Sequence, residues 1–326
     1  MRAYTVAFFL ALFLLLCAFA PVLAETPAPT PTLAPPETPI PARIHEIPNP
    51  SPVPPTVVDR TSDPTAWPSF RFRLDANLLE IWFPNIMNAD EAILCYQGSA
   101  WLIDCGDARM GSRGAELLKK LGITRIEKLF NSHPHHDHLN GFKATHQAAP
   151  VEELLVCFPA DSTKHMIDAL AYAEEQSVPV SWYKDGDVFS MGDGQVTIKF
   201  YVGSDPALDM NNASASALVQ FGARRIFFAS DIEKPGQASL LQAVSPEDLR
   251  AEILKYPHHG KSGLDAGFQE AVCPELTVIT NLDVSWEGFK YLRYKQIPYA
   301  VTNTDRGYLH LATDGENWLA EYVQLP

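Results

Sequence analysis

Short apolar runs, several of them alternating with polar residues, predict β-strands along most of the chain beyond residue 67. Helical segments separate many of these runs, and no repeat period is evident. The predicted strands cover residues 71–76, 78–83, 91–96, 100–105, 126–132, 153–158, 178–183, 195–202, 216–222, 224–231, 252–257, 275–281, 299–303 and 307–313. This region therefore has ample material for a sheet-based core.

Helical periodicity appears in four segments between the strands, at residues 112–122, 142–147, 162–176 and 245–251. Gly122 is expected to end the first helix. Ser162 and Ser245 are predicted to cap the third and fourth, because a serine side chain can accept a hydrogen bond from the free amides of a first helical turn.

The first 24 residues predict an export signal. Arg2 precedes an uncharged apolar run, which ends in small or apolar residues at Val22 and Ala24. This layout is typical of a secretory signal peptide cut after Ala24. An uncleaved membrane anchor is the alternative, although spanning takes about 20 apolar residues. In both cases we expect the rest of the chain to lie outside the cytoplasm, secreted or attached to the cell surface.

Residues 25–67 predict a proline-rich, disordered linker. Proline recurs every two or three residues over most of this range, and apolar clusters are absent from the proline-rich part. Such a segment cannot bury enough apolar surface to offset its ordering entropy, and its prolines keep it extended. The folded domain is therefore expected to run from residue 68 to residue 326.

Composition and charge limit the partners. The chain of 326 residues is 46% hydrophobic, as expected for a globular core, and has a net charge of −14. On average this charge repels nucleic acid, so an anionic substrate would need local positive charge, which metal ions can supply. Four cysteines follow the signal, Cys95, Cys105, Cys157 and Cys273. The sequence allows these cysteines to form disulfides or to be buried free thiols.

Histidines and aspartates follow three of the predicted strands. His133 comes after the strand that begins at residue 126, Asp231 ends the strand 224–231, and His258 follows "EILKYP". Because loops at one end of a sheet are where rigid scaffolds present chemistry, we expect these side chains to converge on one site.

The densest of these clusters is "NSHPHHDHLNG", residues 131–141. It contains the pattern H-x-H-x-D-H, formed by His133, His135, Asp137 and His138. Imidazole and carboxylate groups are ligands for divalent metals such as zinc. A surface loop that binds metal adventitiously is the alternative, but the polar residues at two further strand ends favour a catalytic site with two metals.

These motifs together resemble a known family. "SHPHHDHLNG" is similar to the signature of metallo-β-lactamase-fold hydrolases, and "LIDCGD" resembles the strand and turn that precede it. "NNASASALVQFGARRIFFASDIE" and "ILKYPHHGKSG" resemble the later motifs of one subgroup, which includes the hydrolase domain of competence DNA-uptake proteins of the ComEC type. The resemblance covers roughly residues 70–326, with its motifs in the family's order.

The resemblance implies an α/β (α+β) fold, a four-layer αββα sandwich of two mixed sheets flanked by helices. It also implies two divalent metal ions, zinc or alternatively manganese. His133 and His135 match the first metal site, Asp137 and His138 the second, and Asp231 the carboxylate that bridges them. One of His258 and His259 matches the last ligand of the second site. We favour His258, because it directly follows the strand.

The chain departs from the family pattern at the first metal. Many relatives supply a further histidine between the main motif and the bridging aspartate, whereas here Asn211 and Asn212 occupy that region. They are candidate metal or substrate contacts, and the alternative for them is a structural turn. Lys261 replaces a commoner serine.

The catalytic candidates follow from charge. Two divalent ions would lower the pKa of a bound water and supply hydroxide near neutral pH. Asp137 would orient it, and His259 or Lys261 would contact an anionic group of the substrate. The resemblance favours an exported phosphodiesterase acting on nucleic acid or a phosphorylated cell-wall component. A carboxylic ester or lactone hydrolase and a non-catalytic metal-binding surface protein are the alternatives, and the oligomeric state stays open.

Overall fold

The computed structural model of the chain describes residues 44–46, 57–60, 71–73, 77–109, 111–281, 286–302 and 304–326. The predicted signal peptide, residues 1–24, lies outside the described residues. Two short strands, β1 (Ile44–Glu46) and β2 (Val57–Arg60), fall within the range predicted to be a linker. β1 pairs with β3 (Arg71–Arg73) in a two-stranded sheet.

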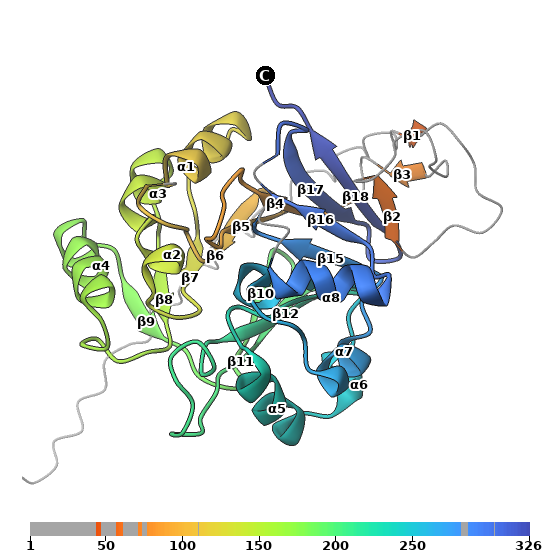
Figure 1. The fold of residues 1–326 in the computed structure, drawn as a ribbon. Helices are drawn as coiled ribbons and strands as arrows, with labels where there is room; N and C mark the ends of the chain where they lie inside the picture. The colour runs from red at the N-terminus through yellow and green to blue at the C-terminus, as the bar shows by residue number, and fades with distance from the viewer. Residues whose placement is uncertain are drawn as a thin grey trace, which may run out of the picture. The chain divides into compact units, whose positions relative to one another are not determined.

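Two larger sheets form the body of the domain (Figure 1). The nine-stranded sheet contains, in spatial order, β2, β18 (Trp318–Val323), β17 (Tyr308–Thr313), β4 (Leu79–Phe83), β5 (Ala92–Tyr96), β6 (Ser99–Ile103), β7 (Lys128–Phe130), β8 (Leu154–Val156) and β9 (Val180–Trp182). The seven-stranded sheet contains β10 (Val188–Met191), β11 (Val196–Tyr201), β12 (Ser216–Phe221), β13 (Arg224–Phe228), β14 (Ile253–Lys255), β15 (Leu276–Ile279) and β16 (Tyr299–Val301).

Both sheets contain parallel and antiparallel strand pairs, and the connections between the strands explain which pairs are which. Hairpins join β4, β5 and β6, which pair antiparallel, whereas β6 to β9 pair parallel and need crossovers, each of which contains a helix. The second sheet repeats this order, since β10 to β13 are antiparallel and β13 to β16 parallel.

One apolar core joins the two sheets. Alternate residues of β5, such as Leu94 and Tyr96, point into it. Phe130 of the first sheet lies with its ring centroid 4.8 Å from that of Phe200 in the second, and Phe83 lies 6.3 Å from Phe228. The sheets therefore pack face to face through large side chains.

Helices cover the outer face of each sheet, which Figure 1 shows as two groups on either side of the strands. α1 (Gly111–Lys120), α2 (His136–Leu139), α3 (Phe142–Ala148) and α4 (Lys164–Glu175) belong to the first group, and their apolar side chains share a core with the outer face of the nine-stranded sheet. α5 (Lys234–Ala243), α6 (Pro246–Leu249), α7 (Ala266–Val272) and α8 (Glu287–Lys295) belong to the second. This arrangement confirms the predicted αββα sandwich.

Local details differ from the sequence predictions. Thr163, and not Ser162, caps α4, since its hydroxyl accepts a hydrogen bond from the Met166 amide at 3.0 Å. Strands β10 and β18 and helices α5, α7 and α8 were not predicted. The four described cysteines are free thiols. Among the described residues, no helix has the length and apolar character needed to cross a membrane.

Candidate metal centre

The predicted strand ends converge at one edge of the sandwich. His133 follows β7, Asp231 follows β13, and His258 and His259 follow β14 in a short 3-10 helix, η1 (Pro257–Gly260). α2 carries Asp137 and His138 to the same place. Since the carboxyl ends of parallel strands meet at one edge of a sheet, loops from both sheets can build a common site here.

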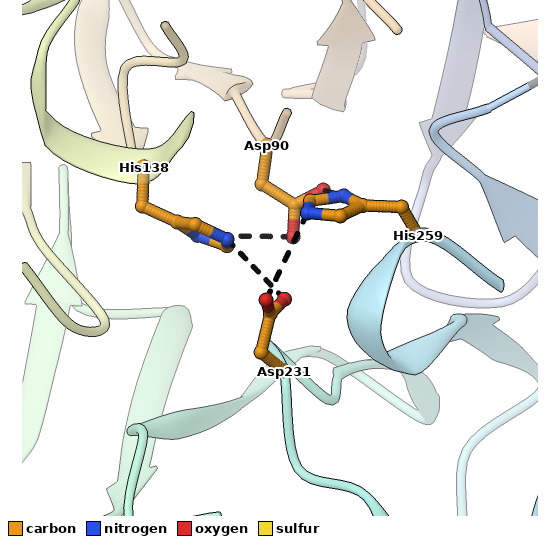
Figure 2. Close-up of side chains that lie close together, drawn as sticks. All are labelled: Asp90, His138, Asp231 and His259. Atoms are coloured by element: carbon orange, nitrogen blue, oxygen red, sulfur yellow. Dashed lines mark hydrogen bonds and ion pairs between the residues drawn. The ribbon is translucent and has the colours of Figure 1, made fainter. Parts of the chain in front are cut away.

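Four buried side chains form the centre of this site, Asp90, His138, Asp231 and His259 (Figure 2). One ligand atom from each lies within 4.8 Å of the others, so the group could hold a metal ion. They come from the β4–β5 loop, α2, the end of β13 and η1, segments far apart in the chain. Figure 2 shows the two rings and two carboxylates facing a common point.

Asp104, which follows β6, contacts the Nδ1 side of the His138 ring. The His138 Nδ1 atom lies 2.7 Å from Asp104 Oδ2, and Asp104 is fixed in turn by the amide and hydroxyl of Ser132, both at 2.7 Å. The other ring nitrogen, Nε2, lies 3.2 Å from Asp231 Oδ1. The ring therefore presents Nε2 to the centre, as metal-binding histidines with a carboxylate behind them do.

His259 repeats this arrangement. Its Nδ1 atom lies 3.0 Å from Asp90 Oδ1 and 2.9 Å from the Thr280 hydroxyl. Its Nε2 atom lies 3.4 Å from Asp137 Oδ2 and 3.8 Å from Asp231 Oδ2. The ring is completely buried.

His258, which we favoured as the ligand, lies at the rim. Its side chain is 13% exposed, with Nδ1 2.8 Å from Glu233 Oε1 and Nε2 3.6 Å from Asp231 Oδ2. Both histidines adopt left-handed backbone angles, with φ of 47° and 54°, and Gly260 follows at 90°. This tight turn, which extended-strand reasoning does not anticipate, directs His259 inward.

His133 and His135 form the second part of the site. His133 is fully buried, and its Nε2 atom lies 3.0 Å from His135 Nδ1 and 3.8 Å from Asp231 Oδ2. Asp231 therefore lies between the His133–His135 pair and the His138–His259 pair, where a bridging carboxylate would be needed.

Burial and charge act in opposite directions on the histidines. Burial holds the pKa of His133 well below its usual range. Burial also lowers the pKa of His138, but Asp231 and Asp104 outweigh it, so that the pKa lies well above the usual value. Because a ring nitrogen must be deprotonated to bind a metal, metal uptake at His138 is linked to proton release.

Three atoms at the centre support a metal fit. His138 Nε2, His259 Nε2 and Asp231 Oδ1 are buried, and none makes a hydrogen bond of acceptable geometry with the described residues. Buried polar groups without partners are costly, and a divalent cation would satisfy all three. Two imidazoles and a carboxylate form a donor set that suits zinc.

The two candidate asparagines, Asn211 and Asn212, make different contacts. The Asn212 side chain is occupied elsewhere, since its Oδ1 accepts from the amides of Glu233 and Gly236 at 3.0 and 2.9 Å and its Nδ2 donates to Asp209. It thus positions the start of α5. Asn211 lies beside His135 and acts to raise the pKa of that ring against the larger lowering by burial.

Lys261 lies at the rim of the site, with Nζ 2.9 Å from His258 Nε2 and 5.8 Å from the centre of the Trp286 ring. Asp90, Asp104 and Glu233 were not among the predicted site residues. "LIDCGD" contains Asp104, so its position just before the histidine motif was a usable signal. Asp90 lies in the β4–β5 loop, where none of the motifs named in the sequence analysis points to it.

The chain was compared with protein families, curated proteins and solved structures. No family model matches the chain. A stretch of 142 residues is 28% identical to ComE operon protein 3 of Bacillus subtilis, and this stretch is 44% of the chain but 18% of that protein. The chain therefore spans less than a fifth of this curated relative.

The solved structures similar to the chain include metallo-β-lactamases and a metallo-β-lactamase-fold protein. A HARLDQ-motif mutant of the metallo-β-lactamase from Cronobacter sakazakii is 16% identical, with a TM-score of 0.41, and the alignment covers 59% of the chain and 89% of that protein. The metallo-β-lactamase-fold protein YhfI from Bacillus subtilis is 12% identical, with a TM-score of 0.43, and the alignment covers 69% of the chain and 96% of that protein.

Proposed function

We propose that this protein is a metal-dependent hydrolase with two metal ions, and that it cleaves phosphodiesters outside the cytoplasm. The observation that carries the proposal is the convergence of unpartnered Nε2 atoms of His138 and His259 on the buried Asp231 carboxylate. Asp137, His138, Asp231 and His259 would hold one ion. His133, His135 and Asp231 would hold the other, with Asn211 as the neighbouring polar group.

Bound divalent ions would supply an activated water and a Lewis acid. Residues of the chain would orient the metal ligands and the reacting water. Asp104 and Asp90 fix the two imidazole rings, and Asp137 presents a carboxylate 3.4 Å from His259 Nε2, on the side where a reacting water can be oriented. Each of these groups is held by buried contacts, which provides the preorganised charge that hydrolysis needs.

Local positive charge favours a phosphodiester over a neutral ester. The chain is strongly acidic overall, yet Lys261 places an ammonium group beside His258 at the open side of the centre. A phosphodiester keeps a negative charge that this group can contact, whereas a carboxylic ester or lactone does not. The ComEC-like sequence motifs support the same choice.

We expect the purified protein, loaded with zinc or manganese, to hydrolyse bis(4-nitrophenyl) phosphate and to lose this activity in EDTA. The physical reason is that the bound ions would supply the activated water and the Lewis acid, and EDTA would remove them. Release of 4-nitrophenol, followed with and without added metal, measures the effect.

The discriminating comparison uses 4-nitrophenyl acetate and a simple lactone under the same conditions. Rapid ester or lactone turnover without phosphodiester cleavage would replace our proposal with the alternative hydrolase. Tight metal binding without turnover of any of these substrates would support the non-catalytic metal-binding protein.

Replacing Lys261 with methionine should raise KM for the phosphodiester about tenfold and leave kcat nearly unchanged. The ammonium group is exposed, so it is expected to bind the charged substrate in the ground state and the transition state alike. Steady-state kinetics on the phosphodiester and a neutral ester measure the difference. An equal change for both substrates would contradict charge recognition by Lys261.

A further inference from the structure

A lysine is buried directly behind the proposed metal centre. Lys255, the last residue of β14, is 2% exposed, and its ammonium group forms a short ion pair with Asp90 Oδ2. Among the described residues, its other hydrogen-bond partner is the Ser230 carbonyl oxygen at 3.4 Å, in the loop that leads to Asp231. A buried ammonium group is costly unless it is paired, so this contact is a specific feature of the site.

Both oxygens of Asp90 are already engaged. Oδ2 contacts Lys255, while Oδ1 accepts from the Thr280 hydroxyl at 2.6 Å and lies 3.0 Å from His259 Nδ1. The backbone of Asp90 is fixed as well, because its amide donates to the Asp137 carbonyl at 3.0 Å and its carbonyl accepts from the Gly106 amide at 2.8 Å. The carboxylate therefore has little freedom to turn towards a metal.

Asp90 lies on the Nδ1 side of the His259 ring. Asp90 contacts Nδ1, whereas Asp137 and Asp231 lie on the Nε2 side. A histidine that gives one nitrogen to a carboxylate is left with the other for a metal. Thus Asp90, although close to His138 and Asp231, occupies the place of an outer partner.

We propose that Asp90 and Lys255 form a positioning pair, in which Lys255 keeps Asp90 out of the metal's ligand set and Asp90 orients His259 for binding through Nε2. This inference rests on the proposed metal centre. It assigns a role to a carboxylate that proximity alone would count as a fourth ligand.

The test replaces both members of the pair. Asp90→Asn alone would leave the Lys255 ammonium buried without a counter-charge, whereas the double variant Asp90→Asn/Lys255→Met removes both charges and is expected to fold. The matched control is Asp168→Asn/Lys164→Met, the same substitutions in an exposed pair on α4. Thermal unfolding of each variant checks the fold.

Zinc affinity is measured by competition with a chromophoric chelator, without reference to turnover. We expect the double variant to bind as many zinc ions as the wild type, with the affinity at the His259 site about ten- to a hundredfold weaker. In a His259→Ala background, which is expected to lose the ion at this site, the same two substitutions should not lower the affinity for the remaining zinc ion, since the pair acts through the His259 ring. The control should match the wild type.

Two results would overturn the inference. Loss of a zinc ion in the double variant, as complete as in Asp231→Ala, would make Asp90 a direct ligand, and unchanged affinity would make the pair purely structural. If the double variant does not fold, ¹⁵N NMR of the zinc-loaded wild type decides, because a protonated Nδ1 on His259 is required and a metal-bound Nδ1 contradicts it. Zinc binding without hydrolysis would reject the proposed function alone, and absence of zinc binding would reject both.

Discussion

Replacing His259 with alanine is expected to remove one metal ion and to lower kcat for the phosphodiester at least about a hundredfold, more than loss of an outer partner usually costs. The His259 ring is fully buried, and its Nε2 atom has no hydrogen-bond partner among the described residues. His258→Ala should keep the metal content, because that ring is bound to Glu233 and lies at the rim.

Metal content by plasma emission spectroscopy and kinetics on the same samples measure both variants. His165→Ala, on α4, serves as a control for the loss of a histidine elsewhere on the chain. If His258→Ala loses the metal and His259→Ala keeps it, the left-handed turn has been assigned the wrong ligand. In that case the original preference for His258 would be restored.

Replacing Glu91 with glutamine should stabilise the protein, and more so at high pH. Glu91 is 2% exposed, and neither carboxylate oxygen has a hydrogen-bond partner among the described residues. A Cβ atom on Gly114 of α1 would collide with the Glu91 carboxylate, so α1 packs tightly against Glu91. Burial without a partner raises the pKa of Glu91 to about 8.

The direction of the pH effect follows from proton binding. Between the usual glutamate pKa of 4.5 and about 8, the folded protein keeps the proton on Glu91 and the unfolded chain does not. The wild type therefore loses stability from this group as the pH rises through that window. Glutamine carries no such charge, so its advantage should be small at pH 4 and grow to at most about 4 kcal/mol at pH 8.

Urea unfolding of the metal-free wild type and variant at several pH values measures this difference. Glu175→Gln, an exposed position at the end of α4, provides the control and should show no pH-dependent advantage. A constant difference between Glu91→Gln and the wild type over pH 4–8 would show that Glu91 is not protonated in the folded state.

The sequence located the centre but not all of its members. The strands that lead to His133, Asp231 and the His258–His259 pair each contain consecutive apolar residues, and this made the strands and their ends predictable. Our proposal prefers His259 to His258 because of the backbone angles of η1 and the burial of the His259 ring. Left-handed conformations at non-glycine residues are uncommon, and nothing in "KYPHHGKSG" other than Gly260 indicates them.

The contact between Asp90 and Lys255 could not be predicted from the sequence for a different reason. They are 165 residues apart and meet only because two sheets pack face to face. In the sequence Lys255 interrupts an apolar strand, where a lysine usually marks an exposed position. Only the tertiary structure shows that this side chain is buried against a carboxylate.

X-ray diffraction from crystals of the zinc-loaded protein, recorded on both sides of the zinc absorption edge, tests the central claim most directly. The anomalous difference map should show a zinc ion within bonding distance of His138 Nε2, His259 Nε2 and Asp231. A second peak is expected beside His133 and His135. Zinc found only on exposed histidines, with no peak between His138 and His259, would contradict the account.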